Sequence, residues 1–215
     1  MEYLKGEGPY FSDHPSIVLA NQAILDSFVP QHPFAFFTIC SWGKPYSRSY
    51  VHNRIREGLF DANLLDKVDY IHMSSAGIVP FDCELWYPFF SYDWNNDCID
   101  DEVTFKLLRD RLSARLTEFI ERMGYAEMFF YIRPSSNTSA AVKVARKRLG
   151  EPTAKRMHYV FPSHIEADYE PSKQVANELA RFRSFVGRPD PDDILTLPSL
   201  LSEATQKMKG VINNG

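Results

Sequence analysis

The chain has 215 residues, of which 44% are hydrophobic and 24% charged, a composition typical of an ordinary globular protein. Its net charge of -4 argues against a freestanding nucleic-acid-binding protein, since such domains are usually basic. It has no apolar run near the roughly 20 residues that span a bilayer, and its first residues lack the apolar segment of a signal peptide. Three cysteines at irregular spacing do not form a disulfide framework, so we expect a cytoplasmic protein without membrane contacts.

Apolar spacing predicts a helix and then a buried strand near the start of the chain. The helix begins with Asp13 as its N-cap and Pro15 in its first turn, and two prolines close it after residue 28. Its apolar positions follow helical spacing: Ile17, Ala20, Ile24 and Phe28. Residues 34–39 form the strand, and a polar loop then leads into a short helix over 50–58.

Further strands alternate with longer helices. A second strand covers 68–73 and a third covers 127–132. Between them, a long amphipathic helix over 100–122 ends at Gly124, which suits a helix C-cap. The core stripe of this helix consists of Val103, Leu107, Leu108, Leu112, Leu116, Phe119 and Ile120. Another sizeable helix covers 137–149.

This alternation predicts an α/β fold, because strands joined by helices pair in parallel through crossover connections. We expect a Rossmann-like three-layer sandwich with a mostly parallel sheet and a small helical C-terminal extension. Residues 1–150 form the Rossmann-like catalytic domain in this interpretation. Residues 151–215 form the extension on the same domain, with a strand over 158–161 and helices over 172–185 and 197–209.

The loop after the first strand gathers reactive side chains: Cys40, Ser41, Lys44, Tyr46, Ser49 and His52. Because ligands bind at the carboxyl ends of strands in open α/β sheets, we interpret it as an active-site loop. A helix N-terminus and the nearby Lys44 or His52 would lower the pKa of Cys40, although Cys40 could equally be one more buried cysteine. Lys44 precedes a proline and is held extended, where it could bind a phosphate or carboxylate or simply be solvated. His52 either faces the same site or caps the helix that follows.

A second candidate loop follows the second strand. Its small residues, Ser74, Ser75, Ala76 and Gly77, would let backbone amides approach an anion, or they form a tight turn that the chain path requires. Aromatic side chains, prolines and carboxylates then alternate: Pro80, Asp82, Glu84, Tyr87, Pro88, Tyr92 and Asp93. This composition suits a pocket that stacks a planar base and holds a cationic amine, and it also suits a lid packed over the sheet edge.

Other charged clusters have simpler interpretations. The acidic residues over 97–102 form the first turn of the long helix, where the helix dipole favours them. Cysteines and histidines lack paired zinc-ligand spacing, so we expect neither a metal nor a cofactor. A basic stretch over 143–156 is compatible with contacts to a phosphate backbone and with a solvated helix face.

The two loops together resemble the core catalytic domain of archaeosine synthase, the lysine-adding family of archaeal tRNA modification. Its first motif matches Cys40, Ser41, Lys44, Pro45, Tyr46, Ser49 and His52, and its second matches Pro80, Asp82, Glu84, Tyr87, Pro88, Tyr92 and Asp93. The resemblance covers roughly residues 13–150 and includes the His14-Pro15 start of the first helix. The chain departs from the motifs at Ile39, Val51 and Ser91, where the family has proline, serine and histidine.

The resemblance implies that an amino-acid amine, that of lysine in the family, attacks the nitrile carbon of a 7-deazaguanine base in tRNA. Cys40 then contacts the nitrile, covalently or as a polar group, by analogy with thiol nucleophiles. His52 shuttles protons, with a pKa near neutrality. Lys44 and Ser41 hold the amino-acid carboxylate or a phosphate.

The remaining matched residues shape the substrate pocket under the same resemblance. Glu84 or Asp93 holds the substrate ammonium, and Tyr46, Tyr87 and Tyr92 surround the base. The small residues Ser49, Ser74, Ser75 and Gly77 complete the substrate-binding set.

Two alternatives stay open at this point. One is an amino-acid transferase that acts on hypermodified bases of phage DNA instead of tRNA. The other is a non-catalytic subunit that binds a modified base or a partner protein. Longer members of the family carry an RNA-binding domain, so nucleic-acid binding could also come from a partner subunit.

Overall fold

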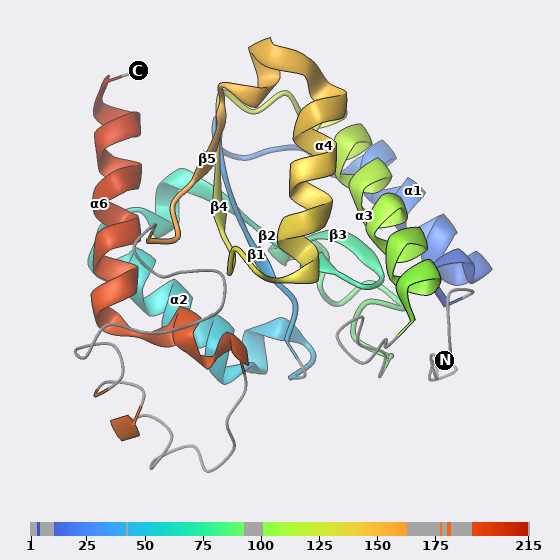
Figure 1. The fold of residues 1–215 in the computed structure, drawn as a ribbon, viewed down its shortest axis with the longest axis horizontal. Coiled ribbons are helices and arrows are strands. Elements are labelled where there is room, and N and C mark those ends of the chain that lie inside the picture. The colour runs from blue at the N-terminus through green and yellow to red at the C-terminus, as the bar shows by residue number, and fades with distance from the viewer. Residues whose placement is uncertain are drawn as a thin grey trace.

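The fold is a five-stranded sheet with helices on both faces (Figure 1). In this computed structural model, residues 4, 11–41, 43–92, 101–162, 177, 180, 181 and 191–214 are described. The strands are β1 (Phe34–Ile39), β2 (Val68–Ser74), β3 (Gly77–Pro80), β4 (Glu127–Tyr131) and β5 (Met157–Tyr159). The main helices are α1 (Pro15–Ser27), α2 (Tyr50–Asp61), α3 (Glu102–Met123), α4 (Asn137–Ala154) and α6 (Pro198–Asn214).

The strand order is β3-β2-β1-β4-β5, and only β3 runs antiparallel to its neighbour. The predicted α/β sandwich with a mostly parallel sheet is therefore confirmed. Each parallel connection passes through a helix, as crossover connections require. Among the described helices, none combines the length and the hydropathy needed to cross a membrane.

Side chains alternate between the two faces of the sheet, and this alternation decides what each face contacts. Phe37 of β1 packs edge-on against Phe119 of α3, so that face is covered by α1, α3 and α4. Phe36 points the other way and stacks on Tyr70 of β2, beneath α2 and α6. Tyr131 of β4 lies on this second face and donates its hydroxyl to the carbonyl of Leu195, just before α6. The α6 helix thus covers the same sheet as the rest of the chain.

Several local expectations differ from the structure. The N-cap of α1 is His14, whose Nδ1 accepts the amide of Ser16, and not Asp13. In α3, Val103 is 80% exposed and Leu107 is also exposed, since the core stripe begins only at Leu108. Asp101 caps α3 and Gly124 ends it in the left-handed conformation, as C-cap glycines do.

The C-terminal part is described only in places. The strand expected over 158–161 is β5, which begins and ends earlier, and the helix expected over 197–209 is the longer α6. The helix predicted over 172–185 lies almost wholly outside the described residues.

Candidate active site

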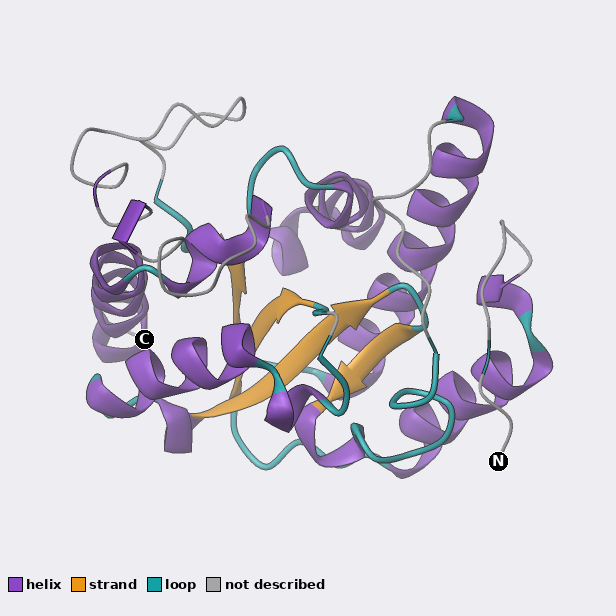
Figure 2. Ribbon diagram, turned by 90° about the horizontal axis from the view of Figure 1, so that it is seen from below, coloured by secondary structure: helices purple, strands orange, loops and turns teal. Residues whose placement is uncertain are grey.

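The site lies at the carboxyl edge of the sheet, where the strand order reverses direction. The chain moves from β1 to β2 on one side and later returns to place β4 on the other side of β1. The connections leaving β1 and β4 therefore diverge, and such a switch point leaves a crevice for ligands. Figure 2 shows this edge from below, with the loops gathered over the strand ends.

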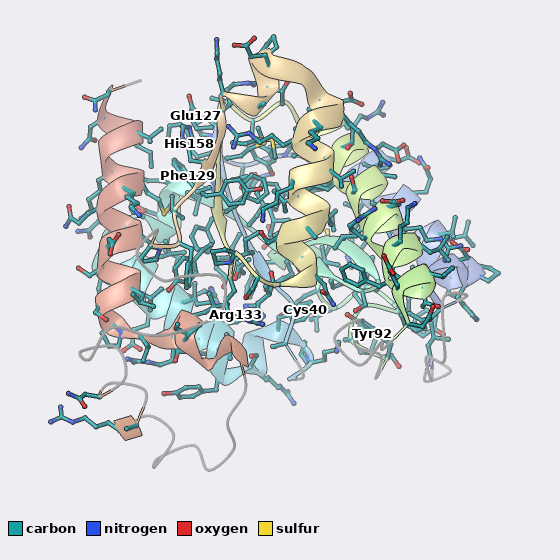
Figure 3. All side chains as sticks on the ribbon, in the orientation of Figure 1. Cys40, Tyr92, Glu127, Phe129, Arg133 and His158 are labelled. Carbon is teal, nitrogen blue, oxygen red and sulfur yellow. The ribbon has the colours of Figure 1, made fainter. Side chains whose placement is uncertain are left out.

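Cys40 and Arg133 stand on the two sides of this switch point. Cys40 follows β1 directly, and Arg133 follows β4 by two residues. The last paired residues of these two strands are Thr38 and Tyr131, so Cys40 and Arg133 each lie two residues beyond this pair, where the chain has left the strands. Figure 3 labels both at the same edge. Arg133 was not predicted as a site residue, although it follows a predicted strand just as Cys40 does.

Two buried phenols lie beside Cys40. The hydroxyls of Tyr46 and Tyr92 are 3.1 Å apart, although the residues are 46 positions apart in the chain. Burial raises the pKa of Tyr46, and Tyr92 and Cys40 add to the shift. Burial also raises the pKa of Tyr92, again with a contribution from Cys40, while hydrogen bonds from Ser74 and Tyr46 oppose it. Both phenols therefore keep their protons near neutral pH.

Lys44 places a positive charge over this pair. Its Nζ lies 4.1 Å from the centroid of the Tyr92 ring and donates to the carbonyl of Ser41 at 3.4 Å. A cation at this distance from a ring face is attracted to it. The half-buried Ser41 donates its own hydroxyl to the carbonyl of Gly43 at 3.2 Å. The predicted grouping of Cys40, Lys44 and Tyr46 in one loop corresponds to this arrangement.

His52 is fully buried and belongs to a cluster of rings beneath α2. Its Nδ1 lies 3.1 Å from the hydroxyl of Tyr70, and its ring lies 5.3 Å from that of Tyr46 and 4.4 Å from that of His72. Burial lowers the pKa of His52 to about 3, and Arg56 and Lys44 add to the effect. The expected pKa near neutrality is therefore wrong, because an imidazolium here would lose its hydration.

His72 was not predicted, although the sequence contains a signal for it. Tyr70 and His72 alternate with apolar residues along the buried strand β2, so they share the face that α2 covers. The His72 ring stacks on Tyr46 at 4.0 Å, and burial lowers its pKa as well. The neutral side chains of His52 and His72 thus pack against the Tyr46 ring and hold it in place.

The second predicted loop is the turn of a hairpin that joins β2 to β3. The amides of Ala76 and Gly77 donate to the hydroxyl of Ser74 at 3.0 and 3.2 Å, so they do not face an anion. Of the two interpretations of this loop, the tight turn is the one that the structure supports. Gly77 has φ = +141° and packs against Asn21 of α1, while Ser75 is buried nearby. Ser74 remains at the site, because its hydroxyl bonds to both phenols.

The other predicted residues occupy the surroundings of this core. Glu84 is buried and accepts the backbone amide of Ser47 at 2.8 Å, which joins the two motif loops. Ser49 is the N-cap residue of α2 and lies against Gly43. Tyr87 is half-buried on the second loop, and Asp93 lies outside the described residues.

The comparisons with known proteins identify a family. A family model described as a domain of unknown function, DUF5591, matches residues 20–151, more than half of the chain. The chain belongs to the DUF5591 family. The matched residues include Cys40, Tyr46, Ser74, Tyr92 and Arg133, so the candidate active site lies within the DUF5591 domain.

One solved structure, the crystal structure of AF0587, a protein of unknown function, is similar over 79% of this chain, with 16% identity and a TM-score of 0.48. The match covers 50% of that protein, so the chain spans about half of its length. No curated protein matches the chain. In the described part of the structure, no group of three or more His, Cys, Asp or Glu side chains could hold a metal ion.

Proposed function

We propose that this DUF5591 protein is a transferase that joins the amine of an amino acid, lysine in the family it resembles, to the nitrile of a 7-deazaguanine base in tRNA. The resemblance of the two motif loops to archaeosine synthase suggests the reaction. The observation that carries the proposal is the position of the Cys40 thiol beside two protonated phenols at the carboxyl edge of the sheet.

The reaction needs a nucleophile, a proton donor and a way to return the proton. Adding an amine to a nitrile forms one C–N bond, breaks one C≡N π bond and moves one proton from the amine nitrogen to the nitrile nitrogen. Negative charge develops on the nitrile nitrogen as the carbon is attacked. A donor positioned at this nitrogen lowers the barrier.

In the first step, the Cys40 thiolate attacks the nitrile carbon and forms a C–S bond. The Tyr92 or Tyr46 hydroxyl gives its proton to the nitrile nitrogen, so a neutral thioimidate and a phenolate result. Their raised pKa values make these phenols donors in the resting state. The Lys44 ammonium over the Tyr92 ring stabilises the phenolate while it exists.

In the second step, the amino-acid amine attacks the same carbon. The C–S bond breaks, the Cys40 thiolate leaves, and the surplus proton of the amine passes to the phenolate. The amidine product forms and both protein groups return to their starting states. In this proposal, Arg133 and Lys44, with Ser41, hold the amino-acid carboxylate at the crevice.

His52 has a positioning role in this proposal. Its low pKa keeps it neutral, and its Nδ1 is engaged with Tyr70. It supports the Tyr46 ring from α2 and does not exchange protons with the substrate.

The test is mass spectrometry of nucleosides after incubating the protein with isotope-labelled lysine and tRNA that carries the nitrile base. The expected result is a mass gain of one lysine on that nucleoside, lost in Cys40→Ala and retained in Cys83→Ala. Parallel reactions with other amino acids and with DNA containing the nitrile base define the substrates. If no acceptor gains mass in any arm, the transferase proposal is wrong and a binding subunit is the better interpretation.

A further inference from the structure

A strongly basic segment begins at the candidate active site. Residues 133–150 contain five cations, Arg133, Lys143, Arg146, Lys147 and Arg148, and no Asp or Glu, in a chain with a net charge of -4. Lys143, Arg146 and Lys147 are exposed on α4. Within the described part of the chain, no carboxylate forms a salt bridge with any of these three. These three side chains therefore present positive charge to the solvent.

One basic side chain of α4 reaches back towards the carboxyl edge of the sheet, where Cys40 lies (Figure 3). The Lys143 ammonium reaches the carbonyl of Pro134 at 3.5 Å, next to Arg133. Lys147 follows one helical turn later on the same face, since residues four apart are neighbours on a helix. Arg133 itself follows β4 and lies at the same edge of the sheet as Cys40 (Figure 3). Arg148 instead faces α3, where it contacts the carbonyl of Asp110.

Aromatic side chains also reach the surface on the two motif loops. The hydrogen bond from the Ser47 amide to Glu84 joins the two motif loops. Next to these two residues, Tyr50 is 42% exposed and Trp86 is 37% exposed. Arg48, between Ser47 and Tyr50, is also exposed. Exposed aromatic rings with cations nearby are the usual platform for the bases of a single strand.

We propose that the exposed face of α4 binds the backbone phosphates of a single-stranded nucleic-acid segment and that neighbouring bases stack on Trp86 and Tyr50. The extruded target base then enters the crevice at Cys40. Cys40 is half-buried, so a base stacked inside a duplex could not reach it without leaving the stack. The identity of the base rests on the proposed function, whereas the strand-binding surface does not.

The first experiment measures binding of a fluorescent single-stranded RNA by anisotropy over a range of salt concentrations. Each phosphate neutralised on a single strand contributes about 0.7 to the slope of log K against log salt. The double variant Lys143→Gln with Lys147→Gln should reduce this slope by about 1.4. The matched control, Lys67→Gln with Arg122→Gln, removes two exposed cations that precede β2 and β4, at the opposite edge of the sheet, and should keep the wild-type slope.

The second experiment separates stacking from charge. Trp86→Ala should weaken binding about tenfold without changing the salt slope, because stacking a base on an aromatic ring is not ionic. Phe60→Ala removes an exposed ring at the far end of α2 and should have no effect. A DNA strand of the same sequence and a duplex complete the series: tighter RNA or DNA binding identifies the acceptor polymer.

Two results would refute the proposal that this surface binds a single strand. One is an unchanged slope in the α4 double variant, and the other is equal or tighter binding of the duplex. Binding of the strand by the wild-type protein without any transfer would leave the surface intact and refute the transferase. If the α4 double variant still transfers the amino acid and its strand binding is unaltered, the surface is refuted and the transferase proposal stands.

Discussion

Cys40 and Cys83 are two thiols in one chain, and their positions give them different chemistry. Cys83 is 2% exposed, and burial, with help from Asp82, raises the pKa of its thiol to about 12. Cys40 is half-buried at the end of β1. A cysteine reacts faster when more of its thiol is ionised and when a reagent can reach it, so we expect Cys40 to be the more reactive of the two.

We predict that iodoacetamide at pH 8 alkylates Cys40 at least about tenfold faster than Cys83 in the folded protein. Peptide mass spectrometry after timed quenching measures both rates. Unfolding in urea should remove the difference, which serves as the control. Equal rates in the folded protein would contradict the position given to Cys40.

Removing one phenol tests the proton donor. Tyr92→Phe should lower the rate of amidine formation by about 10²–10⁴, the usual contribution of a general acid. Tyr159→Phe is the matched control, because its buried hydroxyl has no hydrogen-bond partner among the described residues. The measurement is the single-turnover rate of amidine formation by the wild-type protein, Tyr92→Phe and Tyr159→Phe. A Tyr92→Phe variant as fast as wild type would exclude Tyr92 as the donor and leave Tyr46.

The buried His52 makes stability depend on pH. Its pKa is near 6.5 in the unfolded chain and about 3 in the folded protein, so between these values the unfolded state binds more protons. Stability should therefore fall as the pH drops from about 6.5 towards 3, with a slope of about 1.4 kcal/mol per pH unit from this group. Urea denaturation at several pH values measures the slope. His52→Gln, which cannot titrate, should show a shallower slope, and an unchanged slope would count against burial of a neutral imidazole.

At the scale of elements, the β2–β3 hairpin is the feature that the sequence did not reveal. The four residues Gly77–Pro80 contain a proline and follow Ser-Ser-Ala, so they carry no strand pattern of their own. They form a strand because Ile78 and Val79 bury their side chains beside β2. Tertiary packing decided the structure here, as it often does for short strands.

The hairpin turn depends on glycine. At Gly77, a Cβ would lie 1.9 Å from the Oδ1 of Asn21, whose amide donates to the carbonyl of Ala76, and φ is +141°. Gly77→Ala should cost about 3 kcal/mol of unfolding free energy, as strained positions do. Gly210→Ala, in α6 with open space around it, should instead stabilise by about 0.5–1 kcal/mol. Urea titrations of both variants provide the measurement, and a neutral Gly77→Ala would contradict the packing of the turn.

The longer elements were predictable because their apolar residues recur with a clear period. The strand over 34–39 and the cap at Gly124 were predicted to the residue. The exposure of Val103 was not predicted. Periodicity shows which face of a helix is apolar, but it does not show at which residue the rest of the protein begins to cover that face.

At the scale of the whole molecule, the sheet order explains why these residues meet. Sequence placed Cys40 at a strand end, but only the strand order shows that this end is the switch point next to Arg133. The contact between Tyr46 and Tyr92 joins two loops through the fold, so no local pattern could predict it. Burial of His52 likewise follows from docking α2 on the sheet, which a helix pattern alone does not reveal.

The most direct test of the account is whether Cys40 forms a bond to the base. The protein is incubated with tRNA carrying the nitrile base but no amino acid, and the denatured mixture is analysed by mass spectrometry. We predict a covalent protein–tRNA adduct that maps to Cys40, is absent in Cys40→Ala, and is released as the amidine product when lysine is added. Transfer of lysine by Cys40→Ala at the wild-type rate, with no adduct in either protein, would contradict the central role given to this thiol.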